Sequence, residues 1–465
     1  MPPIPLSFGL SSNKGRLGLD TNVRVVNAYA RPIGQGGKAE IGLYAGPGLR
    51  EWGAVPTGPH RGWIVVAGIL YVVSGRVLYA VTPAGDASEL AGIPGDEPVQ
   101  FAANALDQPD IMLCATGKLW TIKGGVCVPY DGDAIAGTVV DIDFLRGRFL
   151  IGLANGQFYY TRINSTEIEG DAFYNAEGKP DGLVGLWTRR NEVWLLGTES
   201  VELWSPTQDA DDPFSPLGAG ALPIGCLSAG TIAENNDDIF WVDNNRQVRR
   251  ANGYTPKEIS PEWVVEVIQA EPDTSSLRGF TFSLGGVNWY VLRGSTFTLW
   301  YNLNTNQWTE RETLRSKVWR GLGAISFADK TLIGDDRSGS IWQLDADCAL
   351  DGPDEIMVRL QSPIVHAWPM PLSIYSLHVD VLSMPRAGDF DEGQRTIRCR
   401  VSEDGGLSWF APLTHVMGVR GAAGRVVFRQ LGTFERQGAT IELVMSATAA
   451  RCVMSAVING QQGST

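Results

Sequence analysis

Positive charge is scarce in this sequence and is nowhere gathered into a block. Its 38 Lys and Arg residues are outnumbered by 51 Asp and Glu residues, which gives a formal net charge of −13 over 465 residues. Because no run of Lys or Arg could neutralise consecutive phosphates, high-affinity nucleic-acid binding is disfavoured. A DNA conduit is not excluded, since an acidic wall repels a polyanion and lets it slide past.

Cysteine is also sparse, with six residues scattered in neither disulfide-scaffold nor metal-knuckle spacing, so we expect reduced, mostly buried thiols. The longest apolar run, WIVVAGILYVV from Trp63, is too short to span a bilayer. The opening MPPIPLSFGL has prolines where a signal peptide has a charged start. We therefore expect neither export nor membrane insertion, and we interpret the glycosylation sequon at Asn164 as chance.

Catalytic and metal-binding signatures are missing as well. The four histidines do not fall at metal-ligand spacing, and no G-x-S-x-G motif surrounds a serine. GQGGKA at residues 34–39 is only superficially like a phosphate-binding loop, because Ala39 stands where a Mg²⁺-binding Ser or Thr is required. We therefore predict no catalytic, cofactor-binding or metal-binding residue. The histidines are His60, His366, His378 and His415.

What the sequence does contain is a recurring hairpin pattern. Two short runs of alternating apolar and β-branched residues flank a Gly or Asn turn, which is typical of antiparallel strand pairs. The first residues of successive hairpins are 38 to 50 positions apart. Seven hairpins of this kind begin at Gly68, Ile111, Phe149, Glu192, Asp238, Asn288 and Thr331.

This spacing is typical of the four-stranded blades of a β-propeller, which are roughly 40 to 50 residues long. The 15 Trp and 55 Gly residues fit this interpretation, because wide rings fill the space between blades and Gly serves tight turns. An array of β-sandwiches would show similar hairpins at less regular spacing. We therefore predict an all-β protein with a β-propeller of six or seven blades.

The pattern stops after about Asp345, where DADCALDGPDE forms an acidic, turn-rich linker. Longer alternating strands such as SLHVDVLS and TIELVMSAT follow and predict a β-sandwich. One short helix is expected after Ser260, with Ser260 as its N-cap and Pro261 as its first residue. The predicted units are an N-terminal strand or extension segment over 1–50, a β-propeller over 51–348 and a C-terminal β-sandwich domain over 349–465.

Several stretches occur in the order found in a known family. Residues 139–161 (VVDIDFLRGRFLIGLANGQFYYT) and 179–205 resemble that family's central segment, in which a PDG turn precedes a strand pair ending in an aromatic residue. The helix after Ser260 and residues 318–345 match further elements, and residues 27–49 resemble the opening block. By this collinear order the sequence is similar to the packaged-DNA stabilisation proteins, or tail hubs, of short-tailed bacteriophages.

The resemblance implies a structural, non-enzymatic subunit of the virion tail that is assembled in the host cytoplasm. It implies six copies in a homohexameric ring below the portal and its adaptor protein, where they close the channel after packaging. Tail fibre, spike or plug proteins would attach to this hub or nozzle. Double-stranded DNA would pass through it during ejection without sequence-specific binding. The family supplies no catalytic residues.

The alternative function is a carbohydrate-binding or glycan-hydrolysing propeller. SEDGGLSW at residues 402–409 fits the Asp box of sialidase propellers, but it occurs once, outside the repeats, and we interpret it as a device that ties a turn. A glycan site would need a pocket in which Trp lies beside paired carboxylates. A scaffold propeller that binds peptides is disfavoured, because the repeated Trp-Asp signature of that class is missing.

Acid pairs and one basic hairpin are the remaining candidates. Such acids could serve a glycosidase or bind calcium, and LRGR at residues 145–148 could contact DNA. Acid-rich turns are more often solvated loops, and paired arginines at a hairpin are usually solvated or ion-paired, so we assign them no function. The acid pairs are Asp141/Asp143, Asp211/Asp212 and Asp335/Asp336.

Overall fold

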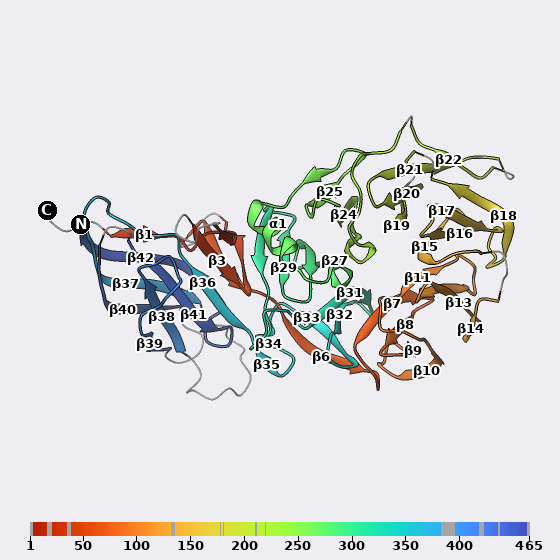
Figure 1. The fold of residues 1–465 in the computed structure, drawn as a ribbon. Helices are drawn as coiled ribbons and strands as arrows, with labels where there is room; N and C mark the ends of the chain where they lie inside the picture. Colours follow the sequence, from red (N-terminus) through yellow and green to blue (C-terminus); the bar gives the residue numbers. More distant parts are fainter. Residues whose placement is uncertain are drawn as a thin grey trace.

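The computed structural model is built almost entirely of β-strands and has two parts, a propeller and a β-sandwich, that lie side by side (Figure 1). The fold class predicted from the sequence is therefore confirmed. The structure describes residues 3–15, 21–34, 39–131, 135–176, 178–179, 181–209, 212–218, 220–382, 396–417, 423–435 and 438–462.

The propeller has seven blades within the described residues, each with four antiparallel strands. In the first three blades these are β7 (His60–Val66), β8 (Ile69–Ser74), β9 (Val77–Val81) and β10 (Ala87–Gly92); β11 (Gln100–Ala103), β12 (Ile111–Ala115), β13 (Lys118–Lys123) and β14 (Val126–Pro129); β15 (Val139–Leu145), β16 (Arg148–Leu153), β17 (Gln157–Thr161) and β18 (Ile168–Asn175). The next three contain β19 (Leu183–Arg189), β20 (Glu192–Gly197), β21 (Val201–Pro206) and β22 (Phe214–Pro216); β23 (Ala233–Asn235), β24 (Asp238–Val242), β25 (Val248–Ala251) and β26 (Lys257–Glu258); β27 (Arg278–Leu284), β28 (Val287–Arg293), β29 (Thr298–Asn302) and β30 (Gln307–Glu310). The seventh contains β31 (Gly321–Phe327), β32 (Lys330–Asp335), β33 (Ser340–Asp345) and β6 (Gly48–Ala54).

All seven predicted hairpins are present, and each one supplies the second and third strands of a blade. These strands have sheet neighbours on both sides, and in several of them five consecutive residues are buried. The turn chemistry also follows the sequence. Gly124 and Gly125, between β13 and β14, both have positive φ (55° and 81°), as a two-residue hairpin loop requires.

The ring of blades is closed by a strand from the N-terminal part of the chain. β6 pairs antiparallel with β33, so the outer strand of the seventh blade precedes the first blade in sequence. Beyond β6, the N–H of Val55 donates to the carbonyl of Gly339 at 2.8 Å. Opening the ring would therefore require breaking this ladder.

A separate apolar core fills each junction between neighbouring blades, and seven such cores complete the circle. Between the fourth and fifth blades, Trp194 and Trp241 are fully buried with ring centroids 6.2 Å apart. Between the fifth and sixth, Phe240 stacks on Tyr290 at 4.8 Å. Burial of an aromatic side chain of this size stabilises the fold by about 2–3 kcal/mol. Tryptophan therefore fills the space between blades, as predicted.

The sandwich is assembled from both ends of the chain, seen as red and blue strands packed together in Figure 1. One sheet contains β1 (Ile4–Leu6), β4 (Ala28–Pro32), β5 (Ile41–Ala45), β37 (Leu372–Leu382), β40 (Ala423–Phe434) and β42 (Cys452–Gln462). The other contains β2 (Asn13–Lys14), β3 (Asn22–Val26), β36 (Met357–Gln361), β38 (Thr396–Ser402), β39 (Leu413–Val416) and β41 (Thr440–Ser446). The described residues of the segment 1–50, which was expected to be separate, therefore divide between this sandwich and the closing strand β6. A single apolar core lies between the two sheets.

The remaining elements are short. β34 (Leu350–Asp351) and β35 (Asp354–Glu355) extend the seventh blade beside β6. The 3-10 turn η1 (Ala229–Thr231) precedes the fifth blade, and η2 (Thr274–Ser276) follows the predicted helix. That helix, α1, spans Glu262–Gln269, and its N-cap is Pro261. Ser260 was expected to be the cap, but its hydroxyl accepts a hydrogen bond from the N–H of Val248 at 3.0 Å and so secures β25 instead.

Candidate functional sites at the domain junction and the propeller axis

One sheet continues from the sixth blade into the sandwich. The blade strand β30 meets β3 in a parallel bridge at Glu310 and Val26, and β3 pairs antiparallel with β36. β41, β38 and β39 extend the same sheet. Main-chain hydrogen bonds therefore link the propeller and the sandwich in addition to the covalent connections.

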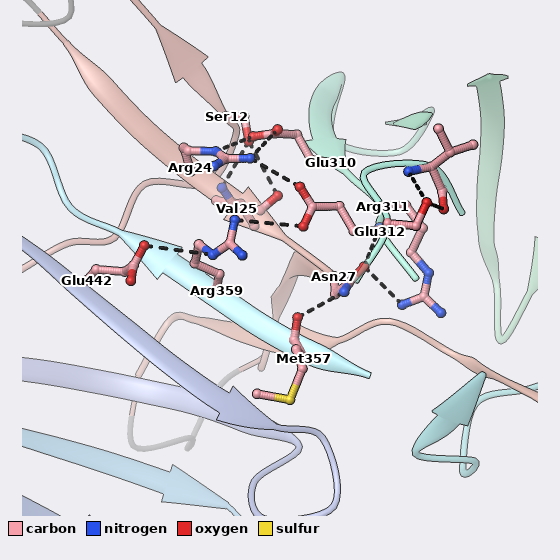
Figure 2. A network of polar contacts seen from close by, with 12 residues as sticks. Ser12, Arg24, Val25, Asn27, Glu310, Arg311, Glu312, Met357, Arg359 and Glu442 are labelled. Atoms are coloured by element: carbon pink, nitrogen blue, oxygen red, sulfur yellow. Dashed lines mark hydrogen bonds and ion pairs between the residues drawn. The ribbon is translucent and has the colours of Figure 1, made fainter. Parts of the chain in front are cut away.

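Glu310 is the centre of a charged cluster at this junction (Figure 2). Its carboxylate accepts from Arg24 at 3.0 and 2.7 Å, from Lys14 at 2.8 Å and from the hydroxyl of Ser12 at 3.2 Å. Burial alone would raise the pKa of Glu310, but Arg24 and Lys14 hold it at about 2. A blade carboxylate thus binds three side chains from the N-terminal strands of the sandwich.

Arg311, the next residue, forms a buried ion pair with Asp351. Arg311 Nη2 lies 2.6 Å from Asp351 Oδ1, and both side chains are 1% exposed. The guanidinium also donates to the carbonyl of Pro47 at 2.9 Å and lies over the rings of Trp300 and Trp319. This pair joins three segments where the chain passes between propeller and sandwich, so its role is mechanical rather than chemical.

Asn27 also connects segments at this junction, through its side-chain amide (Figure 2). Its amide nitrogen donates to the carbonyl of Met357 at 2.9 Å, and its amide oxygen accepts from the N–H of Glu312 at 2.8 Å. Its backbone has φ 57°, a conformation that Asn adopts more readily than most residues. The position therefore favours the residue type for both its backbone and its side chain.

A cavity of about 790 Å³ opens at the propeller axis, where the inner strands of the second, third and sixth blades begin. Its lining is mixed polar and apolar and includes the acids Asp96, Glu97 and Asp273 and the base Arg278. A smaller hollow of about 170 Å³ adjoins it and is lined in part by His60. No tryptophan lines the larger cavity among the described residues, so it lacks the platform that the glycan alternative requires.

The two axial bases hold the backbone. Arg61 donates to the carbonyls of Glu97, Gly75, Ile93 and Pro94 at 2.7 to 3.1 Å. Arg278 donates to the carbonyls of Ser275 and Leu277 at 2.6 and 2.7 Å. Burial lowers the pKa of both arginines. Both arginines therefore hold the backbone segments that line the two cavities.

Of the predicted acid pairs, Asp141 and Asp143 accept hydrogen bonds from the backbone of the neighbouring blade. They project from the inner strand β15 and accept from the N–H groups of Leu186 (3.0 Å) and Thr188 (2.7 Å) in the neighbouring inner strand β19. Burial raises the pKa of Asp141 to about 8 and that of Asp143 to about 6. The pair therefore ties the third blade to the fourth, and the expectation of a solvated loop is wrong here.

The other acids are also structural. Asp335 receives Arg320 in a two-pronged contact at 3.2 and 2.9 Å, and Asp336 pairs with Arg293. Asp212 accepts from the hydroxyl of Tyr174 at 2.5 Å, while Asp211 lies outside the described residues.

The basic hairpin and the Asp box also have internal partners. In LRGR, Arg146 donates to Asn191, and Arg148 donates to the carbonyl of Thr161 at 2.7 Å. In the Asp box, Asp404 accepts from the N–H and hydroxyl of Ser408 at 2.8 and 2.5 Å, which ties the turn as expected. Neither motif gathers a catalytic set.

The remaining candidates place no metal or membrane site in the described part of the chain. No three His, Cys, Asp or Glu side chains come together there as a metal-binding group. The same residues include no helix with the length and hydropathy of a membrane span. GQGGKA falls mostly outside the described residues. Burial lowers the pKa of His60 to about 4, consistent with a neutral core histidine.

The junction residues were not found from the sequence. Glu310 and Arg311 stand in the segment QWTERETL, which has no motif, and the partner Arg24 is 286 positions away. The one local signal is a pair of charges at the end of a strand with buried neighbours. Such a pair is also typical of a solvated strand end, so only the fold distinguishes the two.

A protein-family model described as "Bacteriophage P22 Gp10, beta-propeller" matches residues 3–349. No curated protein matches the chain. Among solved structures, the WD40 domain of Neurospora crassa Pan2 is 10% identical with a TM-score of 0.41, over 64% of this chain and 96% of that domain. The computationally designed protein Ika8 is 10% identical with a TM-score of 0.40, over 64% and 99%. PorZ of Porphyromonas gingivalis is 13% identical with a TM-score of 0.40, over 70% of this chain and 44% of that one.

Proposed function

The chain belongs to the family described as bacteriophage P22 Gp10, beta-propeller, and is a structural phage protein; on this basis we propose that it is the tail hub, or nozzle, subunit of a short-tailed phage. In this role six copies form a ring below portal and adaptor and close the DNA channel after packaging. The ring also anchors tail fibres, spikes or a plug. The family match over residues 3–349 is the single observation that carries the proposal.

The construction of the molecule supports a mechanical role. A seal against packaged DNA must resist deformation. In the closed ring of blades, an apolar core fills each junction between neighbours. The sandwich is held to the sixth blade by a shared sheet and by the ion pairs of Glu310 with Arg24 and Lys14. Force applied to one part is therefore passed to the other without a flexible linker.

The charge supports passage rather than binding of DNA. A net charge of −13 repels phosphates, and the arginines of the basic hairpin are engaged within the chain. We propose that acidic side chains line the wall of the assembled channel, so that DNA slides during ejection.

Averaging of intact phage particles tests the proposal. The expected result is six copies of this chain around the tail axis, below portal and adaptor, with the channel closed. Isolated monomers in the presence of both portal and adaptor would contradict it. Density for the chain elsewhere in the particle would do the same.

Glycan binding remains a second candidate because of a hollow in the sandwich. A cavity of about 500 Å³ is lined by Trp409 and Phe410 together with Glu403 and Glu435. An aromatic ring beside two carboxylates is an arrangement suited to a sugar. A glycan array probed with the full chain and with Trp409→Ala tests it, and Trp368→Ala is the control, since Trp368 is exposed (71%) in the same domain. Inert behaviour of the unmodified chain would end this candidate.

A further inference from the structure

One position in the third strand of each blade faces the junction with the preceding blade. There it lies opposite a buried residue of the second strand, as Tyr79 lies opposite Val72 in the first blade. In five of the seven described blades this position holds a large apolar residue of the junction core. The propeller therefore normally fills this position with a bulky side chain. The five residues are Tyr79, Trp120, Tyr159, Leu299 and Trp342.

The fourth and fifth blades carry a charge at this position. Glu202 lies opposite Leu195 in the fourth blade, and Arg249 lies opposite Trp241 in the fifth. Arg249 is neutralised, because its Nε lies 2.6 Å from Asp243 Oδ2. Glu202 is 8% exposed, yet no Lys, Arg or His nitrogen of the described residues lies within 4.0 Å of its carboxylate. Burial of a charge without a counterion is costly, so a cation at this carboxylate would be favoured.

A hollow of about 550 Å³ opens beside Glu202, where the third and fourth blades meet. This volume is within the roughly 300–1,000 Å³ typical of ligand pockets. Phe173 and Tyr174 of β18 and Trp204 of β21 contribute aromatic walls from the two neighbouring blades (Figure 1). Among the described residues that line the hollow, Glu202 is the only charged one. The space that a core ring occupies in other blades is therefore replaced here by a hollow with one carboxylate.

The carboxylate of Glu202 is held in place but not saturated. Its two oxygens accept from the N–H of Gly178 at 2.7 Å and from the indole N–H of Trp204 at 3.3 Å. An ionised carboxylate offers about four acceptor positions, so capacity is left for a ligand. Trp204 is itself fixed, since its ring lies 5.2 Å from that of Tyr174 and 5.2 Å from that of Phe158.

We propose that this hollow is a binding site for a cationic group, an alkylammonium or a guanidinium, which pairs with Glu202 and lies against the aromatic walls. A cation supplies the missing counterion, and aromatic faces attract it further. An anion would be repelled by Glu202, and an uncharged ligand would leave the carboxylate without a counterion. The same chemistry is carried by a Lys or Arg side chain of a partner protein and by a free polyamine.

This proposal goes beyond the hub function and does not depend on it. The hollow lies within one subunit, and its binding is measured on the isolated chain. It can therefore fail while particle averaging still supports the hub, and the reverse is also true.

Titrations of the full-length chain followed by ligand-observed NMR test the site. The probes are spermidine, N-acetyl-lysine amide, N-acetyl-arginine amide and the uncharged N-acetyl-norleucine amide. At least one cationic probe should bind, and the norleucine amide should not. Glu202→Gln removes the charge at nearly constant size and should weaken this binding about tenfold or more. The matched control is Glu199→Gln, which should bind as the wild type does, because Glu199 is exposed in the adjacent turn and outside the hollow.

A second variant separates loss of the site from loss of the fold. Glu202→Tyr introduces the residue type that the first and third blades have at this position. It should fill the hollow and abolish binding, while the melting temperature stays the same or rises.

The outcomes distinguish the sources of the cation and can overturn the site. Binding of the lysine or arginine amide indicates a protein side chain, and binding of spermidine alone indicates a free polyamine. The site is overturned if no cationic probe binds the wild type or if the norleucine amide binds equally well. Unchanged binding in Glu202→Gln or in a folded Glu202→Tyr variant would overturn it too.

Discussion

Ring closure includes a close approach of two main-chain segments beside the β6–β33 ladder, and a methyl group placed there should weaken it. Gly339 precedes β33, and a Cβ built on it would lie 2.0 Å from the carbonyl oxygen of Val55 and 2.3 Å from that of Thr57. Both are backbone atoms beyond β6, so neither can move aside by a change of rotamer. Relief requires the chain after β6 to move by roughly 1 Å or more, since such atoms normally sit at about 3.5 Å.

The expected destabilisation of Gly339→Ala follows from this clash. Overpacking costs about 1–3 kcal/mol, and loss of the hydrogen bond from Val55 to Gly339 adds about 1 kcal/mol, so we expect about 3 kcal/mol in total. At a denaturant dependence of about 3 kcal/mol per M, the urea midpoint should fall by about 1 M. Tryptophan fluorescence is the assay, because Trp342 in β33 and Trp52 in β6 report on the closing blade.

Gly53→Ala is the matched control, since Gly53 lies in β6 itself and has nothing within 4 Å of its would-be Cβ. Replacing this Gly should leave stability unchanged or raise it by about 0.5 kcal/mol, through a less flexible unfolded chain. An unchanged midpoint for Gly339→Ala, or equal losses in both variants, would refute the closure argument.

Three further predictions concern buried charge. Asp351→Asn should cost about 3–5 kcal/mol because Arg311 is left unpaired, and Arg311→Met with Asp351→Leu should recover most of that loss in a urea titration. The pKa of Glu310 is about 2 in the fold against an ordinary value of 4.5 for a glutamate side chain. Its contribution to the free energy of unfolding is therefore fully present above pH 4.5 and is lost as the pH falls toward 2. Glu310→Gln should flatten this part of an acid-unfolding curve. The pKa of Asp141 is raised from 3.8 to about 8, so the wild type should lose stability as the pH rises between those values. Asp141→Asn should show a smaller slope of melting temperature against pH. An equal slope would contradict the raised pKa of Asp141.

The repeat architecture could be predicted because it is local. A hairpin needs two adjacent strands and a turn, and all three lie within about 15 residues, so the pattern from Gly68 to Thr331 identified the central strands of every blade. The spacing does not decide between six and seven blades, and the seventh blade takes its outer strand from residues 48–54, nearly 300 positions before β33. The spacing of the hairpins does not reveal that a strand from the start of the chain completes the last blade.

The long-range contacts could not be predicted for a related reason. Asp141 and Asp143 have the sequence pattern of solvated acids, and only the packing of β15 against β19 places backbone N–H groups before them. Ser260 precedes a proline and a helix, which favours a cap, yet the N–H of Val248 takes its hydroxyl. In each case a side chain with several available partners is fixed by a neighbour that is distant in sequence.

Closure of the ring and attachment of the sandwich are performed by the same stretch of chain. The polypeptide leaves the sandwich after β5, enters the seventh blade as β6 and returns beside it after β33. Arg451, from the sandwich, donates to the carbonyls of Gly46 and Cys348 at 3.4 and 3.2 Å and so clamps the outgoing and returning segments together. A pull on the sandwich is therefore shared by two strands that are hydrogen-bonded to each other. Separating the sandwich from the propeller would in addition break the bridge between β30 and β3 and the ion pairs of Glu310, so the two parts should unfold together rather than come apart as independent domains.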